Sequence, residues 1–255
     1  MRIAEVLFSQ GFGSRRECAA LLAAGLVQCQ GRTLLDPHEH LPTEGLSFSV
    51  QGRLWPFQQP AMLMLHKPAG YECSRSPKHH PSVLSLLPTP LRRRGVQPVG
   101  RLDEDTTGLL LLTDSGSLIH RLTSPKWHVP KIYEVRTRHP IDDVQVQQLL
   151  DGVMLHEDAV IARALACQRA DSHSLQLTLG EGRYHQVKRM LAAVGNRVEA
   201  LHRSQMGPLR LANDLPAGTW RWLSDDERTA LLTQGKAGQE PDAGVIQDAG
   251  RRPDL

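Results

Sequence analysis

The chain has 255 residues, of which 40% are hydrophobic, enough to form one or two globular domains with a sizeable core. Its 30 basic and 27 acidic residues leave a net charge of only +3, so the total charge does not indicate a partner. Its apolar runs are shorter than the roughly 18 residues of a membrane span, which argues against membrane insertion. Glu5 interrupts the start, unlike a secretory signal, and the four cysteines form no C-x-x-C pair, so we expect a cytoplasmic protein without a disulfide framework.

The distribution of charge along the chain is more informative than its total. Residues 61–140 carry 12 basic and 6 acidic side chains, and residues 181–210 carry 6 and 2, whereas residues 1–60 are neutral overall. If the fold brings the two basic segments together, they form a face suited to a polyanion such as nucleic acid. The alternative is that residues 61–140 form an ordinary solvated surface.

The first 54 residues predict a small domain of two helices and a sheet. Apolar residues at helical spacing begin at Ile3, and the S-x-x-E pair Ser14 and Glu17 is typical of a capping box that opens a second helix. Short strand-like segments follow. The prolines of W-P-F-Q-Q-P predict a linker over residues 55–60.

Arg15 and Arg16 lie in the first turn of the predicted second helix. The free backbone N–H groups of a helix N-terminus favour phosphate, so these arginines are candidate RNA-binding residues. The alternative is that both are simply solvated.

The segment 61–234 predicts a second domain in which helices and strands are mixed irregularly. We expect a tail without packed structure over residues 235–255, which show no hydrophobic periodicity. The irregular order of elements favours an α+β fold over a doubly wound sheet. The predicted strands are 61–65, 108–113, 131–138, 174–179 and 219–224, and the predicted helices are 141–153, 183–195 and 224–232.

The segment G-R-L-D-E-D-T-T-G-L-L-L-L-T, residues 100–113, places three consecutive carboxylates against an apolar strand. A carboxylate at the entrance of a buried strand is partly desolvated, so its pKa depends on its partner. Arg101 is adjacent, and the basic helix 183–195 can supply a second cation. The alternative is that Asp103 or Asp105 merely caps a turn.

Two further places hold candidate functional residues. In G-E-G-R-Y-H-Q-V-K-R-M, residues 180–190, Arg183 and Lys188 lie close to a predicted helix N-terminus, which is suited to an anion. Tyr133 in K-I-Y-E-V lies on a predicted strand and is either a platform for a base or an ordinary core tyrosine. The phosphate-binding, dinucleotide-binding, metalloprotease and hydrolase motifs are missing from the sequence, and His79–His80 has no metal-ligand spacing around it.

Together these segments resemble the pseudouridine synthases of the ribosomal small-subunit synthase A type. K-P-A-G-Y (67–71), G-R-L-D-E-D-T-T-G-L-L-L-L-T, K-I-Y-E-V, E-G-R-Y-H-Q-V-K-R-M-L-A-A-V-G-N and L-H-R-S-Q-M-G-P-L-R-L (201–211) follow the family's motifs in order. The resemblance covers about residues 1–233. It implies an S4-like RNA-binding domain over 1–54 and a catalytic domain over 61–234 with a mixed, mostly antiparallel central sheet.

The resemblance also implies roles for individual residues. Asp103 is the expected catalytic carboxylate, Lys188 its ion-pair partner, and Tyr133 the side chain that packs against the target base. Leu201 is expected to line the pocket. Arg101, Arg183 and Lys67, with Arg15 and Arg16 of the first domain, are expected to contact substrate RNA.

The implied reaction is the isomerisation of a uridine to pseudouridine in 16S ribosomal RNA, at position 516. The substrate is either free RNA or a partly assembled small subunit. Because the reaction involves no redox step and no phosphoryl transfer, we expect neither cofactor nor metal. We also expect a monomer that does not bind membranes.

Three other functions remain open at this level. A non-catalytic RNA-binding or ribosome-assembly factor needs only the basic segments, and a synthase acting on a 23S uridine needs the same chemistry on another target. A glycosidase that pairs Asp103 with Glu104 or Asp105 is disfavoured, because neighbours in sequence rarely flank a substrate from both sides.

Overall fold

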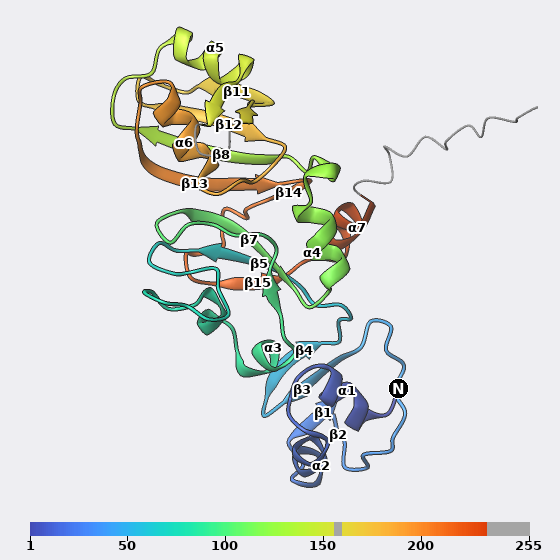
Figure 1. The fold of residues 1–255 in the computed structure, drawn as a ribbon. Coiled ribbons are helices and arrows are strands. Elements are labelled where there is room, and N and C mark those ends of the chain that lie inside the picture. The colour runs from blue at the N-terminus through green and yellow to red at the C-terminus, as the bar shows by residue number, and fades with distance from the viewer. Residues whose placement is uncertain (156–159, 234–255) are drawn as a thin grey trace, which may run out of the picture.

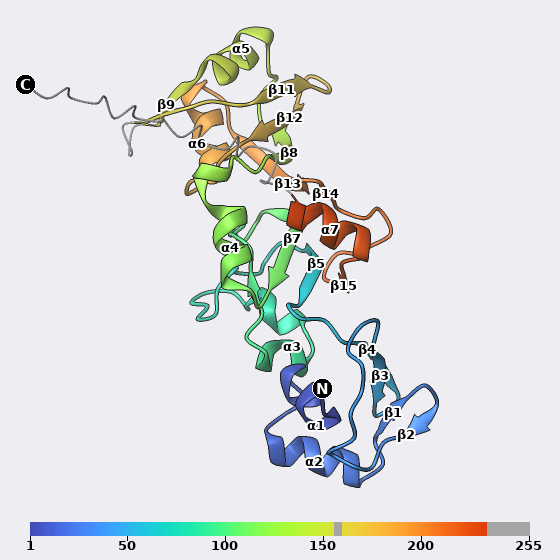
Figure 2. The same ribbon diagram turned by 90° about the vertical axis from the view of Figure 1, so that its right-hand side faces the viewer.

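The computed structural model describes residues 1–155 and 160–233, which form an elongated molecule with a small N-terminal unit at one end (Figures 1 and 2). The tail predicted over residues 235–255 lies outside the described residues. Among those residues, no helix is long and apolar enough to cross a membrane.

The N-terminal unit contains two helices and a four-stranded sheet of order β2-β1-β3-β4, as the sequence predicted. Ser14 and Glu17 form the predicted capping box, each accepting a hydrogen bond from the other's backbone N–H. The elements of this unit are α1 (Ile3–Ser9), α2 (Arg15–Ala23), β1 (Val27–Cys29), β2 (Arg32–Thr33), β3 (Ser47–Val50) and β4 (Arg53–Pro56).

The second part of the chain is built on a mixed sheet of nine strands, with the order β11-β12-β8-β13-β7-β5-β15. The strands β14 and β6 pair with β13 and β7 at its margins. Within the described ranges, every pair of this sheet is antiparallel except β13 with β7, in agreement with the predicted mostly antiparallel α+β fold.

The strands of this part are β5 (Met62–Lys67), β6 (Gln97–Pro98), β7 (Thr107–Thr113), β8 (Lys131–Thr137), β9 (Val153–Leu155), β10 (Val160–Ala162), β11 (Ala166–Arg169), β12 (Ser174–Leu179), β13 (Val198–Met206), β14 (Leu209–Arg210) and β15 (Trp220–Trp222). The helices are η1 (Val83–Leu86), α3 (Thr89–Arg93), α4 (Gly116–Thr123), η2 (Pro125–Trp127), α5 (Asp143–Asp151), α6 (Gln186–Ala193) and α7 (Asp225–Thr233). The strands β9 and β10 form a separate hairpin.

The central strands β5 and β7 are buried on both faces, which explains why they are apolar throughout. Leu63 and Leu110 pack into a core shared with the N-terminal unit, whereas Met64 and Leu111 pack on the other face under α4 and α7. A third core lies between α5, α6 and the strands β8, β11 and β12. The sheet therefore carries helices on both sides and supports the N-terminal unit at one end (Figure 1).

The linker predicted over residues 55–60 begins too early, because β4 continues to Pro56. Trp55 is buried and packs edge-to-face against Phe12 and Trp222, so this residue belongs to the core. Pro56 pairs with Ser47 on the edge strand of the small sheet, where a missing N–H is tolerated.

A buried polar cluster joins the N-terminal unit to the larger sheet. Arg94, just after α3, forms an ion pair with Asp114 at 2.7 Å and donates to the Gln10 side chain at 2.6 Å and to the Gln58 carbonyl at 2.7 Å. Trp55 donates its indole N–H to the same Gln10 oxygen at 3.4 Å. One guanidinium therefore satisfies acceptors from both parts of the chain.

We expect Arg94→Met to lower the free energy of unfolding by about 3 kcal/mol, because it leaves the buried Gln10 and the partly buried Asp114 without their cationic partner. The measurement is urea denaturation followed by tryptophan fluorescence. Arg92→Met, which changes an exposed arginine nearby, serves as control and should stay within about 0.5 kcal/mol of the parent. Equal effects of the two substitutions would contradict the role of the cluster.

Candidate active site

The loop between β6 and β7 carries Asp103, and a buried lysine holds this loop in place. Lys67, at the end of β5, is 0% exposed, and its ammonium donates to the carbonyls of Pro68, Glu104 and Thr106 at 3.0, 2.9 and 2.8 Å. These bonds use all three donors of the group. The predicted contact between Lys67 and substrate RNA is therefore wrong, since its side chain is enclosed and fully used within the protein.

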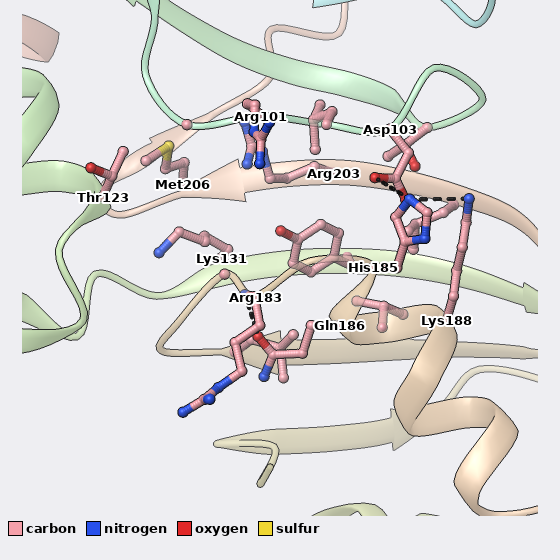
Figure 3. Close-up of a pocket in the computed structure, with 18 of the residues that line it drawn as sticks. Arg101, Asp103, Thr123, Lys131, Arg183, His185, Gln186, Lys188, Arg203 and Met206 are labelled. Atoms are coloured by element: carbon pink, nitrogen blue, oxygen red, sulfur yellow. Dashed lines mark hydrogen bonds and ion pairs between the residues drawn. The ribbon is translucent and has the colours of Figure 1, made fainter. Parts of the chain in front are cut away.

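Asp103 lies between the Lys188 ammonium, near the start of α6, and the imidazole of His185, the residue just before this helix. One carboxylate oxygen is 3.3 Å from His185 Nε2, and the other is 3.3 Å from Lys188 Nζ (Figure 3). The expected pair of Lys188 with Asp103 is thus present, but Lys188 also contacts both oxygens of Asp105 at 2.7 and 2.8 Å. The site contains a cation shared by two carboxylates rather than a simple pair.

The charges around Lys188 fix its protonation state. Burial alone lowers the pKa of Lys188, but the hydrogen bond to Asp105 and the negative charges of Asp103 and Asp105 outweigh it and hold the pKa above its ordinary value. Burial raises the pKa of Asp105, and the hydrogen bond and charge of Lys188 more than reverse this, so the pKa is lowered. Lys188 is therefore a cation and Asp105 an anion at neutral pH.

The floor of the pocket is one face of the strands β8 and β13. Tyr133 is buried and lies opposite Arg203 in the strand register, and Lys131 lies opposite Met206. Residues 131 and 133 are buried and alternate with less buried positions, so they point to the same side of the sheet. The principal side chains that line the pocket are Arg101, Asp103, Lys131, Tyr133, Arg183, His185, Lys188, Leu201 and Arg203.

Arg183 and Tyr184 precede the helix rather than opening it. The helix was predicted to begin at Arg183, but α6 begins at Gln186, because His185 adopts a left-handed conformation with φ 48°. Arg183 still lines the pocket, with its guanidinium 3.0 Å from Glu181. Tyr184 is 65% exposed and stacks on His185, with ring centroids 3.8 Å apart.

His185 is a residue of this site that sequence reasoning missed, as are Lys131 and Arg203. His185 occurs in the E-G-R-Y-H-Q-V-K-R-M segment, three positions before Lys188, a spacing that brings side chains to one side of a helical turn. That spacing was the available signal, although only the fold shows that both side chains meet Asp103.

The sequence and the fold also match known proteins. The profile of the family described as RNA pseudouridylate synthase matches residues 61–193. Ribosomal small subunit pseudouridine synthase A of Yersinia pestis is 45% identical over 231 residues, covering 89% of this chain and 96% of that protein. The chain belongs to the RNA pseudouridylate synthase family.

Two further comparisons support this membership over nearly the whole chain. The Bacillus subtilis protein YtzG, an uncharacterized RNA pseudouridine synthase, is 38% identical over 230 residues, covering 89% of this chain and 96% of that protein. A crystal structure of a pseudouridylate synthase superposes with a TM-score of 0.65 at 31% identity, covering 91% of this chain and 99% of that one.

The two arginines predicted in the first turn of the second helix lie far from the pocket of this synthase. Arg15 and Arg16 are exposed on α2, at the opposite end of the molecule from α6 (Figures 1 and 2). The Arg15 guanidinium lies over the Phe8 ring, 5.1 Å from its centroid. The fold thus brings Arg101, Arg183 and Lys188 together but leaves Arg15 and Arg16 on a separate surface.

The basic segments 61–140 and 181–210 meet at this pocket, since Arg101 and Lys131 come from the first and Arg183, Lys188 and Arg203 from the second. Among the residues that the structure describes, no cluster of three or more His, Cys, Asp or Glu side chains has the arrangement of a metal site.

We expect Lys188→Met to reduce pseudouridine formation by on the order of 100-fold or more, as for the loss of a proton-transfer or charge partner. Asp103 and Asp105 then lie close together without Lys188, so one of them tends to take up a proton. Because the unpaired carboxyl ionises again at higher pH, part of the loss should be recovered as the pH rises. The measurement is the single-turnover rate as a function of pH.

Lys188→Arg is the conservative control and should retain much of the rate. Asp105→Asn leaves Asp103 its cation and should cost less than about 10-fold. If Asp105→Asn proves as damaging as Lys188→Met, Asp105 has a direct part in the reaction.

Proposed function

We propose that this pseudouridine synthase isomerises a uridine of 16S ribosomal RNA, at position 516, with Asp103 as its catalytic carboxylate. The observation that carries the proposal is the position of Asp103: it lies between His185 and Lys188 at one end of a pocket whose floor is Tyr133. The choice of the small-subunit RNA is supported by the name of the Yersinia pestis relative, with which this chain shares 45% identity.

The reaction detaches uracil from the ribose and reattaches it through another ring atom. The bond from C1′ to N1 breaks, the ring turns, and a bond from C1′ to C5 forms while the C5 proton leaves and N1 takes up a proton. An ionised Asp103 can serve either as a nucleophile toward the sugar or as a base that removes a sugar proton. Both roles need a carboxylate, and one of its oxygens lies 3.3 Å from Lys188 Nζ.

The rest of the pocket fits a nucleotide that has been turned out of its RNA. A base can be modified at its ring only after it leaves the stack. Tyr133 provides an aromatic surface at the floor, Leu201 adds an apolar wall, and Arg101 and Arg183 at the rim can contact the phosphates on either side of the target.

The N-terminal unit is the second contact with RNA in this proposal. Its two helices and four-stranded sheet suit an S4-like RNA-binding module, with Arg15 and Arg16 exposed on α2. Since residues 1–60 carry no net charge, the rim of the pocket is expected to supply more of the affinity. The protein's bacterial relatives are named for ribosomal RNA modification, which suits an enzyme that acts in the cytoplasm.

The direct test maps pseudouridine in rRNA from cells with and without this gene, and in rRNA incubated with purified protein. The parent enzyme should convert one 16S uridine, whereas Asp103→Asn should form no pseudouridine while binding the RNA with a Kd within about threefold, because it removes a charge and not a phosphate contact. Modification of a 23S uridine instead would show that the substrate is the large-subunit RNA. Binding without modification by the parent enzyme would indicate an assembly factor.

We expect RNA affinity to fall steeply with salt, since each phosphate contact releases counterions. The double variant Arg15→Ala/Arg16→Ala should lower the slope of log K against log salt by about 0.7 per lost contact, the single-strand value. Its single-turnover rate at saturating RNA should match the parent, because α2 lies far from the pocket. An unchanged slope would show that these arginines do not contact RNA phosphates.

A further inference from the structure

Two buried cations on the pocket floor have no part in the mechanism above. Arg203 is 2% exposed and Lys131 is 6% exposed, and both line the same pocket as Asp103. Lys131 lies two residues before Tyr133 on β8, and Arg203 is the cross-strand partner of Tyr133 on β13. The aromatic floor is therefore flanked by two positive charges on the same face of the sheet.

Neither cation has a carboxylate as a direct partner. Arg203 donates its Nε–H to the Leu109 carbonyl at 2.9 Å, but its Nη2 is buried without a hydrogen-bond partner. Lys131 donates one hydrogen bond, to the Val129 carbonyl at 2.8 Å. Within residues 1–155 and 160–233, neither side chain forms an ion pair with a carboxylate. A buried donor that lines a pocket and lacks a partner indicates that a ligand supplies the acceptor.

The two ends of the pocket differ in their charged groups. Asp103, with His185 and Lys188, lies at one end, and Lys131 and Arg101 lie toward the other (Figure 3). A nucleotide with its ribose at Asp103 and its base on Tyr133 therefore directs the oxygens of the base toward the buried cations.

We propose that Arg203 and Lys131 bind the carbonyl oxygens of the target uracil and stabilise the negative charge that the ring carries while it is detached from the ribose. This inference rests on the proposed function and adds two residues to it. When the bond from C1′ to N1 breaks, its electron pair stays with the ring and spreads onto the two carbonyl oxygens. The same pair forms the new bond from C5 to C1′, so the charge exists only between the two steps.

The same contacts select uracil against cytosine. Cytosine has an amino group in place of one carbonyl, so its N–H donors would face one of these two cations, which has no acceptor to offer. A site built to hydrogen-bond one group strongly rejects an analogue that lacks it, because buried polar groups are left unpaired.

A phosphate is a poorer occupant of this place than the base. The phosphates of the target nucleotide stay attached to the RNA chain, which lies outside the pocket, and Arg101 is exposed at the rim to meet them. Lys131 and Arg203 lie on the floor beneath, where the everted base penetrates deepest.

The test compares Lys131→Met and Lys131→Arg with the parent enzyme in single-turnover pseudouridine formation. We expect the Met variant to lose about 100-fold or more, the effect of removing one donor to a developing negative charge, and the Arg variant to retain most of the rate. The Kd for rRNA should change less than about threefold in both, since no phosphate contact is lost. Lys126→Met, at an exposed lysine on η2, is the matched control and should behave as the parent.

A pH profile provides a second readout that a structural role would not produce. Burial, together with the charge of Arg203 and against that of Glu181, lowers the pKa of Lys131 to about 8. The charged groups around it are Arg203 on β13, Arg101 on the loop before β7, and Glu181 and Arg183 on the loop before α6. The parent rate should therefore fall as the pH rises through about 8, whereas Lys131→Arg should keep its rate to higher pH.

The third readout replaces each carbonyl oxygen of the target uridine by sulfur, a weaker acceptor. One of the 2-thio and 4-thio substrates should slow the parent enzyme, and that penalty should disappear in Lys131→Met. If the Met variant fails to fold, the pH profile of Lys131→Arg and the thio substrates with the parent enzyme decide the question.

The proposal is overturned if Lys131→Met keeps the parent rate, or if it loses affinity for rRNA rather than rate, which would make Lys131 a phosphate contact. A parent enzyme that forms no pseudouridine would instead contradict the proposed function. The two failures are therefore distinguishable within one experiment.

Discussion

The buried ammonium of Lys67 is the contact on which the geometry of the site depends. It binds three backbone carbonyls, two of them in the loop that carries Asp103, and so joins the end of β5 to the start of β7. A carbonyl that is enclosed without a donor is costly, so this loop has one favourable arrangement. Because Asp103 directly precedes Glu104, it is held in this loop before RNA arrives, which is what the proposed catalytic group requires.

The parallel contact of β7 with β13 brings this fixed loop to the rest of the site. Gly108 pairs with Arg203, and its φ of +108° together with the close approach of β13 leaves no room for a side chain: an added Cβ would lie 2.3 Å from the Arg203 carbonyl. The pocket lies at this junction, with Asp103 from one half of the sheet and Tyr133 and Arg203 from the other. Two strands more than 90 residues apart in sequence are thus paired where the reaction is proposed to occur.

The sequence predicts those features that depend on local pattern. The strands 108–113 and 174–179 follow from apolar runs and from alternation, and Asp103 is identified by its motif and its place before a buried strand. The structure adds what depends on tertiary contacts. Trp55 reads as part of a proline-rich linker until its partners from distant segments are known, and Lys67 reads as an RNA contact until the three carbonyls around it are seen. His185 itself adopts the left-handed conformation that ends the loop before α6, and its imidazole contacts Asp103. Both features are known only from the fold.

The positive charges in the pocket are divided between two proposed tasks: attracting phosphate at long range and binding the base at close contact. Exposed cations such as Arg101 attract phosphate at long range, but they are well solvated and therefore weak at close contact. Arg203 and Lys131 are buried, so water screens them little, and their interaction with an oxygen that carries partial negative charge is correspondingly strong. Lys188, in contrast, is already shared between two carboxylates and has little positive charge left for substrate. The cation that contacts Asp103 and the cations proposed to meet the base are therefore different residues of one pocket.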